Sequence, residues 1–150
     1  MKKYLFIIFI ALISFGISQE LKKSRPTRYT AMGFFDHKTG LGIFGVSRTL
    51  YQTDKHEIFA GLGLMPVGAL SMGWKYYMNE APLQYYSVLS IQKISAMGGE
   101  MVAPYLSLGG EKKLTEKLYF NFGISAIARI YSDKKANVIA FPALNLSWRK

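Results

Sequence analysis

Residues 117–131 read KLYFNFGISAIARIY, and their side chains alternate between two kinds. One set is Leu118, Phe120, Phe122, Ile124, Ala126, Ala128 and Ile130, and the other is Tyr119, Asn121, Gly123, Ser125, Ile127, Arg129 and Tyr131. Because successive side chains of a β-strand point to opposite sides, this period of two predicts a strand with one apolar and one more polar face.

The same alternation extends outward in both directions, interrupted by turn residues at near-regular spacing. It predicts strands at 28–35, 41–51, 57–65, 69–78, 83–95, 101–111, 117–131 and 138–148. Each connector is about three to six residues long and carries the Gly, Pro, Asn, Asp, Ser or charge that hairpins need. We therefore predict an all-β fold, a single antiparallel up-and-down β-barrel of about eight strands, with both ends of the barrel domain 28–150 on one side.

Three places depart from a regular pattern. In the strand at 41–51, Ile43 and Phe44 are both apolar although they face opposite ways, which indicates a bulge. Pro104 and Pro142 each remove a ladder donor inside a predicted strand. We expect Pro104 at the rim and a bulge at Pro142.

The first residues have the organisation of a secretory signal peptide. Lys2 and Lys3 precede an apolar run that reaches about Ile17, and small residues follow. A membrane anchor is the alternative, but the run is shorter than the roughly 20 residues that span a bilayer. We predict a cleaved signal peptide at 1–18 and a separate N-terminal segment at 19–27.

Composition narrows the classes of protein that remain. The chain has no Cys, so disulfides cannot support an exported fold. Net charge is +10, and removing Lys2 and Lys3 leaves +8. Export argues against a nucleic-acid partner, and the strands, not helices, must provide any membrane insertion.

Charge is scarce inside the predicted strands, where only Arg48, Lys75, Lys93 and Arg129 lie well within a strand. The less apolar face consists of small polar residues, which suit the narrow interior of an eight-stranded barrel. The apolar face is then expected to point outward and to contact the hydrocarbon of a lipid bilayer. A lipid-facing charge near the bilayer centre costs roughly 2–4 kcal/mol, so Lys75 and Arg129 should point inward, and Lys93 should lie at the rim.

Two stretches resemble small bacterial outer-membrane β-barrel proteins. The first is a hairpin, in which Gly109-Gly110-Glu111-Lys112-Lys113 and Leu114-Thr115-Glu116-Lys117 join two strands. The second is the carboxyl end, whose Leu144, Leu146 and Trp148 are similar to the terminal insertion signal of that class. The resemblance implies a transmembrane barrel in the outer membrane, with outer-membrane lipids and the barrel-assembly machinery as partners.

Candidate chemistry is sparse, and we predict neither a metal site nor a cofactor. The two histidines, His37 and His56, lie in connectors at opposite ends of the expected barrel, where solvated turn residues are common. Zinc normally needs three or four converging ligands. Some small outer-membrane barrels modify lipid A with a His, a Ser and an acid, and this enzyme is kept as an alternative by analogy of fold.

Arg48, Lys75 and Arg129 form a possible basic cluster in the barrel interior. Such a cluster could serve an anion-selective pore, or its members could bond to Tyr and Asn side chains of a plugged interior. Eight strands leave little aqueous width, which favours the plugged interior. Gly61, Gly63, Gly109 and Gly110 precede no helix, so they relieve crowding and do not bind phosphate.

The sequence thus favours a non-enzymatic outer-membrane barrel with a structural or envelope-associated role. A soluble, secreted, lipocalin-like barrel that binds an apolar ligand is the main alternative. Its hallmark is the reverse orientation, with Trp74, Phe120 and Phe122 inside the barrel.

Overall fold

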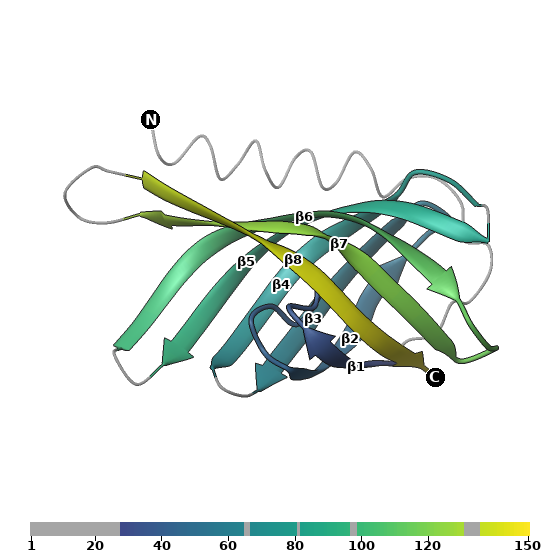
Figure 1. The fold of residues 1–150 in the computed structure, drawn as a ribbon, viewed down its shortest axis with the longest axis horizontal. Coiled ribbons are helices and arrows are strands. Elements are labelled where there is room, and N and C mark those ends of the chain that lie inside the picture. Colours follow the sequence, from purple (N-terminus) through teal and green to yellow (C-terminus); the bar gives the residue numbers. More distant parts are fainter. Residues whose placement is uncertain (1–27, 65–66, 81, 97–98, 131–135) are drawn as a thin grey trace.

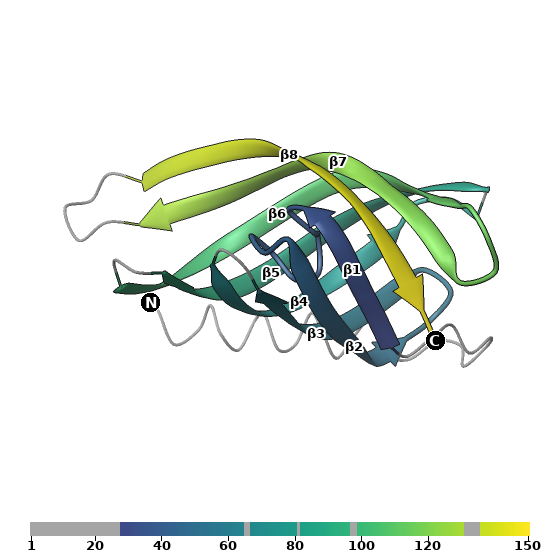
Figure 2. The same cartoon turned by 60° about the horizontal axis from the view of Figure 1, so that its bottom comes forward.

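The computed structural model describes residues 28–64, 67–80, 82–96, 99–130 and 136–150. They form a closed barrel in which each strand pairs antiparallel with the next along the chain, and the last pairs with the first (Figures 1 and 2). The strands are β1 (Arg28–Phe34), β2 (Phe44–Gln52), β3 (His56–Leu64), β4 (Gly68–Tyr77), β5 (Leu83–Ala96), β6 (Gly99–Lys113), β7 (Leu118–Ile130) and β8 (Ala136–Arg149). The prediction of an all-β, eight-stranded barrel is confirmed. The predicted signal peptide at 1–18 and the segment at 19–27 lie outside the described residues.

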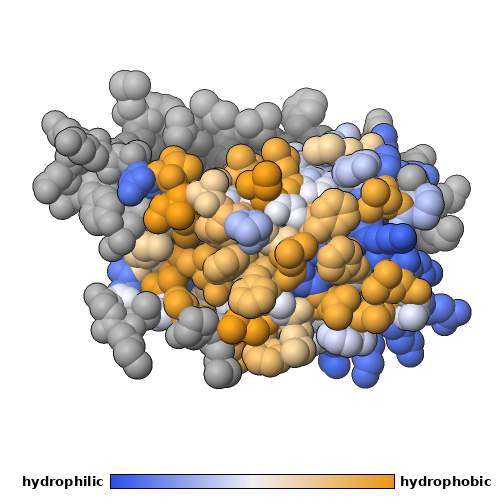
Figure 3. All heavy atoms as spheres, in the orientation of Figure 1, coloured by the Kyte–Doolittle hydropathy of each residue, from blue (hydrophilic) through white to orange (hydrophobic). Residues whose placement is uncertain are grey.

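The two faces of the sheet differ as the alternation predicts. In β8, Ala143, Asn145 and Ser147 are buried inside the barrel, whereas Leu144 and Leu146 between them are exposed. Every strand contributes large exposed apolar side chains to the outer face, and Figure 3 shows them covering the middle of the visible surface. Hydrophilic side chains gather at the end of that view where the C-terminus lies.

The barrel interior contains little apolar core. One cluster consists of Ala69, Ile94, Ala103, Tyr105 and Ile127, and a second consists of Phe59, Tyr77, Tyr86 and Val88. Most of the remaining buried side chains are polar or charged. Hydrogen-bonded polar side chains, as well as apolar ones, therefore fill the space that the eight strands enclose.

Both prolines lie where a ladder has ended. Pro104 pairs with Ile91 of β5, and the ladder between β6 and β7 starts at the next residue, Tyr105. Pro142 pairs with Ile124 of β7, and the ladder between β8 and β1 starts only at Leu144. The missing N–H can therefore face an unpaired edge.

The expected bulge at Pro142 is wrong, because the β7–β8 register continues unshifted past this residue. A bulge is present within 41–51, but it does not lie at Ile43 and Phe44, whose pattern indicated it, because Ile43 precedes β2. The register of β2 on β3 shifts between Thr49 and Tyr51.

The connection between β1 and β2 departs from the prediction most strongly. We expected a short external turn at residues 36–40, but β1 ends at Phe34, β2 begins at Phe44, and residues 36–40 are all buried. The chain leaves β1 through Gly33 and Phe35, both of which have positive φ. It then folds back into the barrel. We call residues 36–40 the inserted segment.

Candidate functional site: a buried polar network

Asp36 organises the inserted segment. Its Oδ1 accepts hydrogen bonds from the backbone N–H groups of Lys38, at 2.8 Å, and Thr39, at 2.9 Å. The N–H of Gly40 donates to the Asp36 carbonyl at 2.8 Å, and Gly40 takes the positive φ of 83° that closes the turn. The carboxylate thus supplies an acceptor for the N–H groups two and three residues further on, which lie outside the strands and lack a ladder partner.

The strands that face the inserted segment have glycine, and so no side chain, at the positions nearest to it. Gly45 of β2 and Gly61 and Gly63 of β3 face the segment, and a Cβ atom at any of them would collide with Thr39 or with the Lys38 carbonyl. The hydroxyl of Ser71 also donates to the Lys38 carbonyl. Glycine thus permits a close approach of two backbones that a side chain would prevent.

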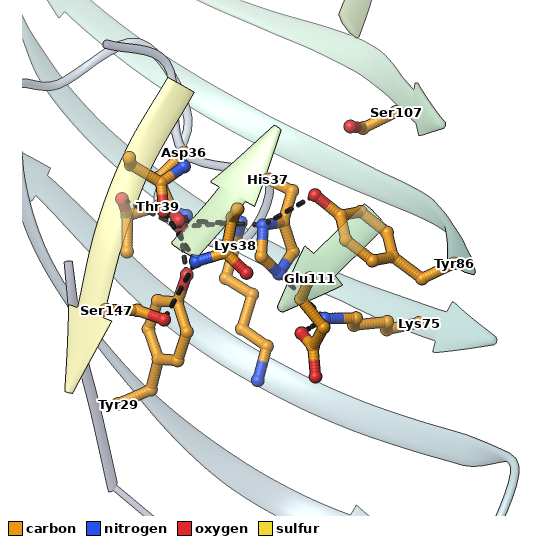
Figure 4. A network of polar contacts seen from close by, with 12 residues as sticks. Tyr29, Asp36, His37, Lys38, Thr39, Lys75, Tyr86, Ser107, Glu111 and Ser147 are labelled. Carbon is orange, nitrogen blue, oxygen red and sulfur yellow. Dashed lines mark hydrogen bonds and ion pairs between the residues drawn. The ribbon is translucent and has the colours of Figure 1, made fainter. Parts of the chain in front are cut away.

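His37 lies at the centre of the network, between Tyr86 of β5 and Lys75 of β4 (Figure 4). Its Nε2 is 3.0 Å from the Lys75 ammonium and its Nδ1 is 3.3 Å from the Tyr86 hydroxyl. A charged ammonium can only donate, so Nε2 accepts and the proton of a neutral ring lies on Nδ1. That proton faces the Tyr86 hydroxyl and the Asp36 carboxylate, whose Oδ2 is 3.6 Å away.

Glu111 of β6 is the acid on the far side of Lys75. The Lys75 ammonium donates to Glu111 Oε2 at 2.6 Å, and the Arg149 guanidinium forms a second ion pair with the same oxygen. Lys75 also lies over the ring of Tyr86, 4.0 Å from its centroid. This lysine is thus held by an acid, an imidazole and an aromatic face.

Glu57 of β3 forms the corresponding group on the other side of the segment. Its Oε1 accepts from the Lys38 ammonium and from the Thr49 hydroxyl, each at 2.5 Å. Its Oε2 accepts from the Tyr77 hydroxyl at 3.0 Å. Lys38 therefore ties the inserted segment to the wall, and Asp36 does the same by accepting from the Tyr29 hydroxyl.

The buried charges balance within the described part of the chain. Three carboxylates, Asp36, Glu57 and Glu111, accompany three cations, Lys38, Lys75 and Arg149, and all six are nearly or fully inaccessible. Burying one unpaired charge would cost several kcal/mol, so the arrangement is stable only as a complete set. His37 within this network is fully buried, so its ring has no exposed atom with which to reach a substrate.

The predicted basic cluster of Arg48, Lys75 and Arg129 is not what fills the interior. Lys75 is buried as expected, but the prediction was wrong for Arg48, which is exposed on the outer face between buried Ser47 and Thr49. The side chain of Arg129 lies outside the described residues. Lys93 is exposed, as expected for the rim, and pairs with Glu100 at 2.7 Å.

The prediction of two solvated turn histidines was wrong for His37, which is fully buried. His56 is half-buried at the start of β3, where its ring stacks on Trp74 with centroids 5.6 Å apart. Within the described ranges, no group of three or more His, Cys, Asp or Glu side chains is placed to hold a metal ion.

Sequence reasoning missed Asp36, Lys38, Glu57 and Arg149 as interior residues. A signal for two of them was present, because Glu57 shares parity with Phe59 and Arg149 shares parity with Ser147, both on inward faces. The inserted segment itself was indicated only by the glycines that face it.

Among the described residues, no helix is long and apolar enough to cross a bilayer. Comparisons of the chain with protein families, with curated proteins and with solved structures find no match. Function must therefore be argued from the barrel itself.

Proposed function

We propose that this chain is a non-enzymatic structural barrel of the bacterial outer membrane, whose interior is closed by its own inserted segment. One observation carries the proposal: the barrel is apolar outside and polar inside. Exposed Leu, Ile, Val, Met and Phe side chains come from all eight strands, whereas acids, amides and hydroxyls fill the interior.

A water-soluble barrel has the opposite distribution, since it buries its apolar face and presents charge to solvent. Soluble monomers rarely expose contiguous apolar patches above a few hundred Å². Here the hallmark of the lipocalin-like alternative is missing at Trp74, which is 43% exposed on the outer face. Hydrocarbon is the solvent in which such a surface is stable.

The carboxyl-terminal strand supports a route into the membrane. Leu144, Leu146 and Trp148 all lie exposed on the outer face of β8, where an assembly machine could read them before or during closure. We expect recognition by the barrel-assembly machinery through these three side chains, with outer-membrane lipids as the lasting partners.

The closed interior supports a structural role over transport. Residues 36–40 are buried, and the charged side chains of Asp36 and Lys38 have partners within the barrel. Purified protein in planar bilayers should therefore give no steady current. A reproducible anion-selective conductance would contradict this part of the proposal.

The membrane proposal is tested by cell fractionation followed by gel mobility with and without heating. The expected result is a band in the outer-membrane fraction that needs detergent and migrates differently once heat opens the barrel. If the mature chain is instead monomeric in buffer without detergent, the soluble alternative takes its place.

A further inference from the structure

Three cations lie side by side on the outer face, where β1 begins and β8 ends. Arg28 is the register partner of Arg48 on β2. The N–H of Arg28 donates to the Lys150 carbonyl at 2.9 Å, and the N–H of Lys150 donates to the Arg28 carbonyl at 3.0 Å. All three side chains are exposed. We call Arg48, Arg28 and Lys150 the cationic row.

The cationic row has no acidic partner within the described part of the chain. None of its members takes part in an ion pair there, in contrast to exposed Lys93, which pairs with Glu100. Like charges directly opposite each other on neighbouring strands are destabilising. An anion bound between the three cations would offset their mutual repulsion, and the described residues supply none.

The surface next to the row changes in steps toward the middle of the barrel. One step in, Trp148 pairs with Thr30, and Thr30 pairs with Val46. At the second step, Leu146, Met32 and Phe44 occupy the same three strands. Charge, then an amphipathic aromatic ring, then pure hydrocarbon is the order of phosphate, glycerol and acyl chain in a phospholipid.

We propose that the cationic row binds the headgroup phosphate of an anionic phospholipid, with Trp148 at the glycerol level. The inference rests on the proposed membrane insertion and names the lipid class at one place on its surface. Two guanidinium groups and an ammonium present donors that suit phosphate oxygens. Clustered Lys and Arg at a membrane surface also enrich anionic lipid locally.

The chain contains two tryptophans, Trp74 and Trp148, and both lie on the outer face. Trp74→Phe leaves a reporter beside the cationic row. Trp148→Phe leaves a control reporter whose register partners are Ile58 and Leu89.

Each protein is refolded into two kinds of vesicle with equal charge and equal quencher. In the first, one lipid in five is brominated phosphatidylglycerol in phosphatidylcholine. In the second, one in five is plain phosphatidylglycerol and one in five is brominated phosphatidylcholine.

Trp148 should be quenched at least about twofold more by brominated phosphatidylglycerol than by brominated phosphatidylcholine, and Trp74 about equally by both. Arg28→Gln with Arg48→Gln should remove the preference at Trp148. The matched control, Lys55→Gln with Lys93→Gln, removes two exposed lysines outside the row and should retain it.

Equal quenching of Trp148 by the two lipids, or a preference that survives the double arginine change, would overturn the inference while leaving insertion intact. Absence of quenching at both tryptophans would overturn the proposed function as well. Should the arginine variant fail to fold, the comparison of Trp148 with Trp74 in chains that keep the row decides alone.

Discussion

The Lys75 ammonium lies 3.0 Å from Nε2 of His37. Lys75 belongs to β4 and His37 to the inserted segment between β1 and β2, so this contact fixes the segment to the barrel wall. The same ammonium is 2.6 Å from Glu111 of β6. One lysine thereby couples the inserted segment to the barrel wall. Its removal affects both.

Lys75→Met should lower the free energy of unfolding by about 3–5 kcal/mol, because Glu111 stays buried with one cation fewer and His37 loses its donor. The control is Lys93→Met, which removes a 48% exposed lysine from an ion pair and should cost under about 1 kcal/mol. Equilibrium urea unfolding in lipid vesicles, followed by tryptophan fluorescence, measures both. Equal midpoints for the two variants would contradict the structural role of Lys75.

Gly61→Val should expel the inserted segment, because any Cβ at this position meets the Lys38 carbonyl. Lys38 then becomes a site for trypsin, whereas in the unaltered protein it is buried and protected. Mass spectrometry of a brief digest in detergent micelles detects the cut after Lys38.

Gly68→Val is the control for that digest, since the nearest atom to a Cβ there is 3.8 Å away. The control should resist cleavage at Lys38 like the unaltered protein. If Gly61→Val also resists cleavage at Lys38, the position of the segment does not depend on the glycine at residue 61.

The barrel could be predicted from sequence because its cause is local. Apolar and more polar side chains alternate along each strand, as from Leu118 to Ile130, and turn-forming residues separate one strand from the next. The period also placed Lys75 inside, since its neighbours Trp74 and Tyr76 lie on the apolar face.

The inserted segment could not be predicted because its cause is not local. Residues 36–40 look like an ordinary polar turn, and only their contacts with β3, β4 and β5 make burial favourable. Arg48 was misplaced although the local period was available, because it shares parity with Phe44, Val46 and Leu50, which are all exposed on the outer face. The register shift between Thr49 and Tyr51 comes after Arg48 and does not change the face on which this side chain lies.

A charge in the middle of the outer face should oppose insertion. Leu106 is exposed on β6, and its register partners are Leu89 and Ala126. Leu106→Arg should destabilise the inserted barrel by roughly 2–4 kcal/mol near the bilayer centre. Leu114→Arg, at an exposed residue in the turn after β6, should change stability little. The fraction of heat-shifted band after refolding into vesicles at increasing urea compares the two. A soluble barrel would tolerate both substitutions alike.

Lipid A should be chemically unchanged by this protein, because the side-chain hydrogen bonds of both histidines go to Trp74, Lys75 or Tyr86 and none goes to a serine nucleophile among the described residues. His37 is wholly enclosed, with both ring nitrogens facing partners inside the barrel. His56 accepts a hydrogen bond from the Trp74 indole N–H at 3.1 Å. Mass spectra of lipid A from cells that express the unaltered protein, His37→Gln, His56→Gln or an empty vector should therefore coincide. If the unaltered protein adds or removes an acyl chain of lipid A, and either substitution abolishes that change, the protein is instead an enzyme.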